Sequence, residues 1–220
     1  MDAASISMYI EETWSTIYMT LISSAISYLI GIPLGVILVV TDKDGIAPCS
    51  AVHTVLGVII NIFRSIPFLI LLVMVLPITK FLVGTTLGPK AIIPPLIIAS
   101  APYIGRMVES SLKEVSAGVI EAAKSMGASN WQIIYKVLIP EAKPSLLVGA
   151  AICITTILSY SAMAGFVGGG GLGAIALNYG YYRYKTDIMM IAVIILVVLV
   201  QMIQEIWMRL SRATDKRARN

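Results

Sequence analysis

The chain reads Glu121-Ala122-Ala123-Lys124-Ser125-Met126-Gly127 and, after nine further residues, Val137-Leu138-Ile139-Pro140. This charged stretch lies between long hydrophobic segments. Its helix-forming residues, broken by one glycine, predict two short helices joined by a sharp turn. Isolated helices of fewer than about 12 residues are marginal in water, so the pair needs packing partners. From the local pattern alone, docking of a second protein and a plain interfacial hairpin are equally open.

The first short helix is expected to begin at Ser116 and to end at Gly127. Ser116 can accept a capping hydrogen bond from the first turn. Val119, Ile120 and Ala123 share one face, because they are spaced by three and four residues. Gly127 is suited to close the helix, since glycine adopts the left-handed conformation without a Cβ penalty.

The second short helix is expected over residues 130–138. Ser129 and Gln132 have the spacing of a capping box, in which each residue bonds the backbone N–H of the other. Pro140 is expected to end this helix, because a proline ring clashes with the preceding turn. The residues expected to share the apolar stripe of this helix are Trp131, Ile134 and Leu138.

The composition places the chain in the membrane. Apolar residues make up 58% of it and charged residues only 13%, against about 25% charged in soluble domains. The excess apolar surface must face lipid, which predicts an all-α polytopic membrane protein. The net charge of +4 does not indicate a nucleic-acid partner. Cys49 and Cys153 are expected to be free thiols.

Five hydrophobic stretches are long enough to cross the bilayer, which takes about 20 helical residues. The second is longer than one crossing needs, and the third is short and begins near two prolines. The expected spans are 17–40, 55–83, 91–107, 145–166 and 188–208.

The distribution of basic residues sets the orientation. With the N-terminus outside, the inner segments hold eleven lysines and arginines and the outer segments only four. Basic residues favour the cytoplasmic side, so an outer N-terminus and a cytoplasmic C-terminus are predicted. The short helices then lie in the cytoplasm. The inner basic residues are Lys43, Arg106, Lys113, Lys124, Lys136, Lys143, Arg209, Arg212, Lys216, Arg217 and Arg219.

The stretch at 121–140 resembles the EAA loop of ABC importer permeases, whose pattern is Glu-Ala-Ala, three residues, Gly, nine residues, Ile, any residue, Leu-Pro. Val137 and Ile139 replace the family's Ile and Leu, and the other five positions match. Three further segments are similar to the methionine-uptake branch of that family. They are Arg64–Phe68, Ala101–Glu109, and Tyr160–Met163 with the following run Gly168–Gly173.

The resemblance implies one permease domain over residues 1–220, with five transmembrane helices and a cytoplasmic EAA loop at about 116–144. It implies a homodimer that assembles with two ABC ATPase subunits and receives a substrate-binding lipoprotein at its outer face. The implied location is the bacterial plasma membrane. Methionine, D or L, is the substrate that it implies. The implied ATPase-coupling residues are Glu121, Ala122, Ala123, Met126, Gly127 and Ala128.

No Gly-x4-Gly-Lys-Ser/Thr motif occurs, so the chain itself is not expected to be an ATPase. ATP and Mg²⁺ are expected in the partner subunit, and no metal or other cofactor in this chain. Cys49 and His53 are too few for a structural zinc site. The alternatives are a permease for another small amino acid or peptide, and a stand-alone channel or secondary transporter. The latter usually carries ionisable residues at the membrane midplane.

The outer half of the fourth span suggests a gate. Methionine is flexible and polarisable, so paired Met163 residues could close an apolar constriction that re-forms in each cycle. Packing against lipid or the core is the competing interpretation. The candidate gate and pathway residues are Ser159, Tyr160, Ser161 and Met163.

Three other features each have two interpretations. Gly31 and Gly35 can serve ordinary helix packing or a dimer contact. Arg64 can anchor the inner end of its span or take part in the pathway. The glycines at 168–173 can form a flexible turn or a bend near the outer mouth. They are not expected to bind a dinucleotide, because no βαβ unit surrounds them.

Overall fold

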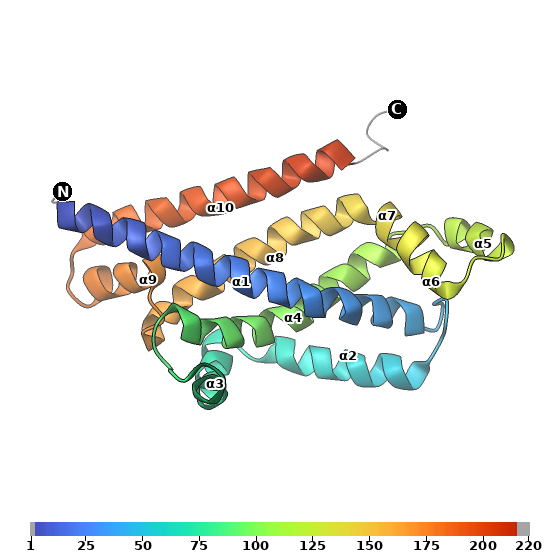
Figure 1. The fold of residues 1–220 in the computed structure, drawn as a ribbon, viewed down its shortest axis with the longest axis horizontal. Coiled ribbons are helices and arrows are strands. Elements are labelled where there is room, and N and C mark those ends of the chain that lie inside the picture. The colour runs from blue at the N-terminus through green and yellow to red at the C-terminus, as the bar shows by residue number, and fades with distance from the viewer. Residues whose placement is uncertain (1–2, 215–220) are drawn as a thin grey trace.

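The computed structural model describes residues 3–214, with side chains from residue 6 onward, as a bundle of helices (Figure 1). No strand occurs in that part of the chain, so the predicted all-α class is confirmed. The basic tail residues Lys216, Arg217 and Arg219 lie outside the described residues. The long helices are α1 (Ala3–Thr41), α2 (Ser50–Ser65), α3 (Phe68–Val83), α4 (Pro89–Lys113), α8 (Lys143–Met163) and α10 (Thr186–Thr214).

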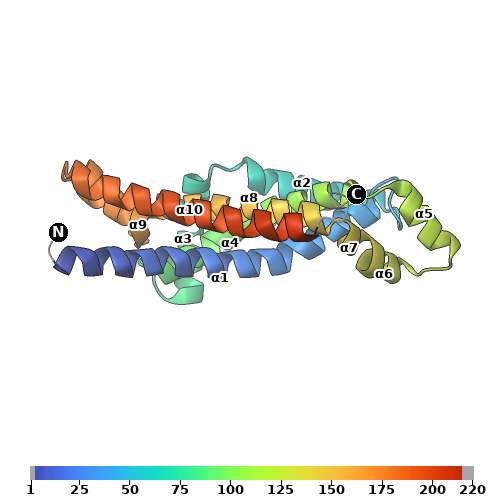
Figure 2. The same ribbon diagram turned by 90° about the horizontal axis from the view of Figure 1, so that it is seen from above.

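Seven short helical segments connect or follow the long ones. Those at one end are α5 (Ala117–Ser125), α6 (Asn130–Ile133), the π-helix η1 (Ile134–Leu138) and α7 (Ile139–Glu141). Those at the other end are the 3₁₀-helix η2 (Ala164–Val167), α9 (Gly171–Ile175) and the π-helix η3 (Ala176–Tyr181). Figures 1 and 2 both place α5 and α6 at one end of the molecule, and α9 with the start of α1 at the opposite end.

The second predicted span is a broken helix. Four described helices are long and apolar enough to cross a membrane singly, and α2 with α3 makes a fifth candidate bent by 104°. The break falls at Ile66, which is extended with φ −81° and ψ 123°. Pro67 explains this, because a proline disfavours helical backbone in the residue before it. The surplus length of the predicted stretch 55–83 is therefore taken up by a sharp change of direction.

Helix α1 packs along α4 through a seam of small residues. A Cβ added to Gly31 would lie 2.5 Å from Ile104 Cγ2, and one added to Gly35 would lie 2.6 Å from the carbonyl oxygen of Gly105. The two backbones approach closely because these positions carry no side chain. Within this chain, the glycine pair therefore serves ordinary helix packing.

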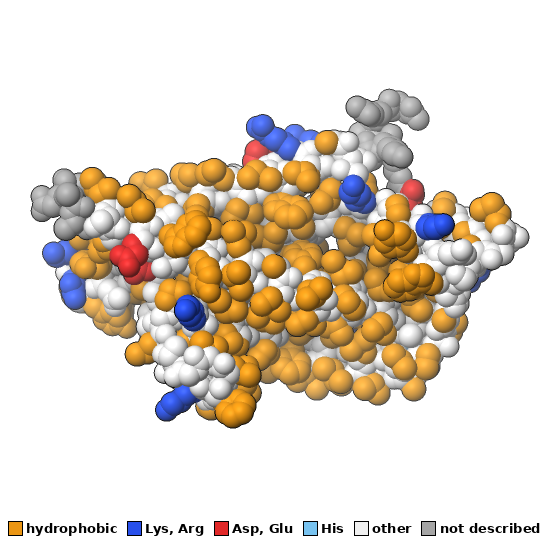
Figure 3. Space-filling view, in the orientation of Figure 1, with side chains coloured by type: hydrophobic (Ala, Val, Ile, Leu, Met, Phe, Trp, Pro, Cys, Tyr) orange, Lys and Arg blue, Asp and Glu red, His pale blue; other side chains and the backbone are white. Residues whose placement is uncertain are grey.

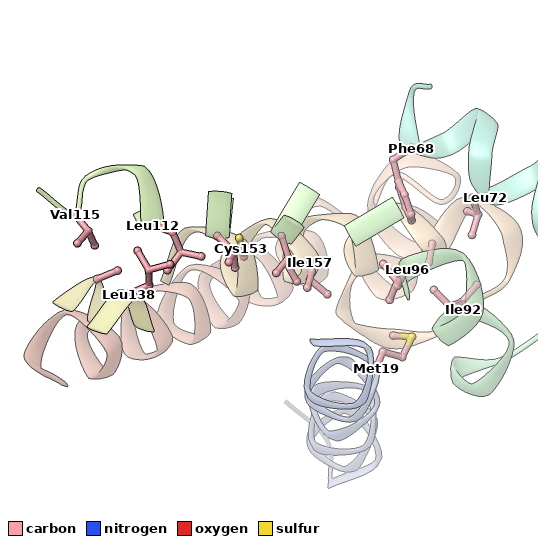
Figure 4. Packing of buried hydrophobic residues seen from close by; sticks show 14 of the residues in the cluster. Met19, Phe68, Leu72, Ile92, Leu96, Leu112, Val115, Leu138, Cys153 and Ile157 are labelled. Carbon is pink, nitrogen blue, oxygen red and sulfur yellow. The ribbon is translucent and has the colours of Figure 1, made fainter. Parts of the chain in front are cut away.

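The apolar core runs along α1, α3, α4 and α8. Figure 4 shows Met19, Ile92 and Leu96 together at one part of the core, and Leu112, Val115 and Leu138 at its far end. The far end is built from α4 and η1, so the core continues into the short helices. Cys153 is buried in this core and Cys49 is exposed, and both are free thiols as predicted.

The exposed surface of the helix bundle is largely apolar. Hydrophobic side chains cover most of the face seen in Figure 3, with few charged groups among them. Only 6% of the most apolar stretch of α10 is buried within the chain. A surface of this kind needs lipid or another protein against it.

Candidate functional site

The turn between α5 and α6 has a defined hydrogen-bonded geometry. Gly127 is left-handed with φ 77°. Its N–H donates to the carbonyl of Lys124 (2.9 Å), and the N–H of Ala128 donates to the carbonyl of Ala123 (3.1 Å). Together these bonds form a Schellman motif. The predicted glycine closure of the first short helix is therefore confirmed.

The start of α6 carries the predicted capping box. The N–H of Gln132 donates to Ser129 Oγ (3.3 Å), and the N–H of Ser129 donates to Gln132 Oε1 (2.9 Å). The two motifs bracket a connection of only four residues, Met126 to Ser129, which leaves the turn little freedom. Ser116 lies at the N-cap of α5 as predicted, but its side chain makes no capping bond, so that detail is wrong.

Pro140 does not end the second short helix. The N–H of Ile139 donates to the carbonyl of Ile134, which is the wider π pattern, and α7 continues through Pro140 to Glu141. A π turn widens the helix ahead of the ring and so relieves the clash on which the prediction relied.

The predicted apolar stripe is also wrong in part. Trp131 is 73% exposed, whereas Ile133 and Leu138 are fully buried. The five-residue spacing of the buried pair follows from the π turn, which shifts the helix face relative to a regular α-helix. Val119, on α5, is likewise exposed, although Ile120 and Ala123 pack inward as predicted.

Some of the predicted coupling residues pack against the core, and the others are exposed. Ala123 is buried and Ala128 packs against the core, so these two anchor the turn. Glu121, Ala122, Met126 and Gly127 are exposed. The side chain of Glu121 makes no hydrogen bond or ion pair with the described part of the chain, so it does not orient the turn from within.

Three large apolar side chains are exposed at this end of the molecule. Met126 is 81% exposed, Trp131 73% and Tyr135 66%. We call these three residues the tip patch. Each would be stabilised by burial, by roughly 1.5–3 kcal/mol for a side chain of this size. A rigid turn presenting such a patch is suited to insertion into a partner.

The four candidate gate residues do not converge on one point. Ser159 and Met163 border an open groove of about 510 Å³ between α8 and α10, which Phe166 and Gln201 also line. Ser161 is buried, and its hydroxyl donates to the carbonyl of Leu158 (2.7 Å). Only Ser159 and Met163 are therefore placed to face a pathway or a second subunit.

Tyr160, the fourth candidate, faces α3 instead of the groove. Its ring stacks on Phe68, with centroids 4.4 Å apart and planes 4° apart. Phe68 is the first residue of α3 after the break in the second span. The contact therefore ties the end of α8 to the bent span.

The glycine run is fixed to α1 by two polar side chains that sequence reasoning missed. The N–H of Gly171 donates to Glu12, and the N–H of Leu172 donates to Thr16 Oγ1 (2.9 Å). Gly168, Gly170 and Gly171 are all left-handed, with φ of 76°, 75° and 80°. The run is thus an ordered bend leading into α9. The available signal was the four-residue spacing of Glu12 and Thr16, which places both on one face of α1.

Arg64 lies deep in its span. It occupies the last turn of α2, just before the break, and is exposed. At about 1.5 Å per residue it lies roughly 21 Å from the start of α2. Arg64 therefore lies at the break of the bent span, away from the start of α2.

A second missed feature is an ion-pair network at the end of α4. Glu109 accepts from Arg106 (2.7 Å) and from Lys113 (2.9 Å), and Lys113 also pairs with Asp42 (2.7 Å). The hydrogen bond from Lys113 lowers the pKa of Asp42. Arg106 Nη2 also donates to Asn61 Oδ1 (3.1 Å) and to the carbonyl of Gly57 (3.2 Å) on α2. The spacing of residues 106, 109 and 113 on one helix could have indicated it.

No group of three His, Cys, Asp or Glu side chains within the described residues is arranged to hold a metal ion. His53 Nδ1 instead lies 3.0 Å from the carbonyl oxygen of Leu38.

Comparison with known proteins identifies the same architecture elsewhere. The sequence model of the family described as "Binding-protein-dependent transport system inner membrane component" matches residues 31–214. The probable D-methionine transport system permease protein MetI of Vibrio cholerae is 49% identical over 210 residues, which cover 96% of this chain and 93% of that protein. The methionine import system permease protein MetP of Bacillus subtilis is 46% identical over 205 residues, covering 93% and 92%.

Solved structures agree with these relatives. A chain of the MetNI methionine ABC transporter, in an inward-facing conformation, superposes with a TM-score of 0.96 at 43% identity, covering 98% of this chain and all of that one. An amino acid ABC transporter solved with histidines superposes with a TM-score of 0.77 at 20% identity, covering 97% and 99%. The second likeness shows a shared fold only.

Proposed function

Because this chain belongs to the family of binding-protein-dependent transport system inner membrane components, we propose that it is the permease subunit of an ATP-driven methionine importer. The observation that carries the proposal is the rigid turn at Gly127, which presents the exposed tip patch at one end of the bundle. The methionine systems of Vibrio cholerae and Bacillus subtilis support the substrate. The relatives are permeases, and the ATPase site is assigned to a separate subunit that holds ATP and Mg²⁺.

The turn can transmit force because it moves as one body. Its ends are fixed by the Schellman motif and the capping box, and Ala123 joins it to the core. When ATP draws two ATPase subunits together, the tip patch of each permease moves with its ATPase. The bundle then changes between inward and outward access, an equilibrium that ATP biases on one side and loaded binding protein on the other.

The orientation follows from the position of the turn. The tip patch must lie in the cytoplasm to meet an ATPase, so α1 begins outside and α10 ends inside. The outer end then presents residues 80–90 and 179–185 to a substrate-binding lipoprotein. In the second segment the guanidinium of Arg183 lies 4.9 Å from the ring centre of Tyr179, and Tyr181 and Tyr182 are exposed.

The pathway is assigned to the interface between two identical copies. Met163 and Ser159 face the open groove beside α10, a helix that this chain leaves largely uncovered. Paired Met163 side chains would close this passage near its outer end. Arg64, exposed at the break in the second span, is the charged group available deeper along it.

Reconstitution tests this function. The chain is co-expressed with its ATPase subunit, placed in proteoliposomes with the binding lipoprotein, and assayed for uptake of labelled methionine. Uptake that requires ATP and the ATPase supports the proposal. ATP-driven uptake of a different amino acid or peptide would change only the substrate. Uptake by this chain alone, driven by an ion gradient, would identify a secondary transporter and refute the proposal.

A further inference from the structure

The ion-pair network at the end of α4 joins three helices. Asp42 follows the last residue of α1, while Arg106, Glu109 and Lys113 lie on α4, and Arg106 reaches α2. The side chain of Glu109 is only 8% exposed, yet each of its carboxylate oxygens has a cation within 2.9 Å. Breaking such a buried pair is strongly destabilising, because it leaves a charge uncompensated. The network is therefore a stiff connection.

One side of the network lies next to the short helices α5 and η1. Lys113 is the last residue of α4, and α5 begins four residues later at Ala117. A cavity of about 310 Å³ beside Lys113 and Asp42 is also lined by Ile120 of α5 and Leu138 of η1. Leu112 of α4 and Leu138 of η1 also belong to one core cluster, so a rigid displacement of α5 and η1 would reach the end of α4 that carries the network.

The other side of the network holds α2. The guanidinium of Arg106 uses one nitrogen for Glu109 and the other for the carbonyl of Gly57 and the amide oxygen of Asn61. A Cβ at Gly57 would lie 3.3 Å from Arg106 Nη2, so the absence of a side chain gives the guanidinium room at the backbone of α2. Helix α2 is the first half of the broken span, and it ends at Ser65, one residue after Arg64.

The geometry of Arg106 gives this link a specific chemical requirement. The guanidinium holds two nitrogens apart in one plane, so that Nη1 serves Glu109 while Nη2 reaches both acceptors on α2. A lysine has three donors but only one nitrogen, so it cannot keep this geometry. The glycine seam joins α4 to α1, whereas Arg106 supplies polar bonds between α4 and α2. The bonds from Arg106 to Gly57 and Asn61 are directional, so a displacement of α4 would also displace α2.

We propose that Arg106, held by Glu109, is a positioning residue that transmits movement of the coupling turn to α2, so that the bent span moves when the ATPases close. This inference rests on the proposed function and adds a transmission path to it. The path runs from α5 and η1 through Lys113 and Glu109 to Arg106 and then to Asn61.

The test compares two variants in the reconstituted complex with its ATPase and binding protein. Arg106→Lys keeps a cation beside Glu109 but gives up the bonds to α2. Asn61→Leu removes one exposed acceptor and leaves the buried charges paired. The matched control is Glu205→Gln, which removes an exposed i,i+4 pair with Arg209 on α10 (2.7 Å) and is expected to have no effect.

Methionine taken up per ATP hydrolysed is the readout. We expect it to fall about fivefold or more for Arg106→Lys, the lower range of typical allosteric couplings. For Asn61→Leu it should fall at least about twofold, as loss of one hydrogen bond implies. Assembly and the ATPase rate should stay at the wild-type level. The double variant should resemble Arg106→Lys, because both changes cut one path.

Three results would overturn the inference. Unchanged uptake per ATP in both variants would show that the bonds between Arg106 and α2 do not transmit the movement. A parallel loss of assembly, ATPase rate and uptake would reduce Arg106 to a structural role. If Arg106→Lys does not assemble, unchanged coupling in Asn61→Leu overturns the inference on its own. A wild-type complex without ATP-driven uptake would instead refute the proposed function.

Discussion

Gly127 has a φ of 77°, and no atom outside its immediate neighbours lies within 4 Å of the position its Cβ would take. A substitution there meets no clash, so its effect comes from the backbone alone. Left-handed backbone costs an L-residue about 1–2 kcal/mol, and a β-branched side chain fares worst. Gly127→Val should therefore distort the turn, preserve assembly and lower methionine uptake per ATP.

Gly118→Ala provides the control for this prediction, because Gly118 lies inside α5 with ordinary helical backbone and room for a methyl group. Alanine favours a helix over glycine by about 1 kcal/mol, so this variant should couple normally. Normal transport by Gly127→Val would contradict the proposed role of the turn in coupling.

Met163 is 41% exposed beside the groove between α8 and α10. If paired Met163 side chains close the outer passage, Met163→Ala should raise leak or the basal ATPase rate, while the complex still assembles. Met202→Ala is the control, since Met202 is similarly exposed, on α10, and does not line the groove. Equal leak and ATPase rates in the two variants and the wild type would show that Met163 serves only packing and is not part of a gate.

At the scale of elements, α1 depends on the small residues that let it approach α4. A Cβ at Gly35 would lie 2.5 Å from Val108 Cβ. Gly35→Val should therefore push the helices apart and destabilise the protein by about 1–3 kcal/mol, the usual cost of overpacking. Thermal unfolding in detergent measures this, and Ile32→Val on the exposed face of α1 should change it little. An unaltered melting temperature for Gly35→Val would contradict the claim that α1 needs a small residue at position 35 to pack against α4.

Sequence reasoning located the elements whose signals are local. The Gly127 turn, the Ser129 and Gln132 capping box and the apolar spans follow from residues that are close together in the chain. It failed where a distant contact or a change of helix type decides the outcome. The π turn at η1 carried the chain through Pro140 and turned Trp131 outward.

The candidate site shows the same division. The coupling residues were identifiable, because their pattern is contiguous. Gly171, the partner of Glu12, lies 159 residues away in the chain, and Asn61, the partner of Arg106 on α2, lies 45 residues away, so no spacing rule could find these two contacts. Likewise, Ser159 and Ser161 are two residues apart on one helix, and only the packing of α8 shows that one is exposed and the other buried.

At the scale of the whole molecule, the two native cysteines can report the orientation. Cys49 is exposed in the turn between α1 and α2, at the end that carries the tip patch, and Cys153 is buried in the core. If that end is cytoplasmic, a membrane-impermeant maleimide should label Cys49 only in permeabilised cells. Cys153 should stay unlabelled in the folded protein under both conditions.

Tyr184→Cys, made in a chain with Cys49→Ser, supplies the opposite reporter. Tyr184 is 88% exposed and lies between η3 and α10, at the end where α1 begins. It should be labelled in intact cells. The reverse result, with Cys49 accessible from outside and Tyr184→Cys only after permeabilisation, would place the Gly127 turn outside. No ATPase could then reach the tip patch, because nucleotide-hydrolysing subunits act in the cytoplasm, and the proposed coupling would be impossible.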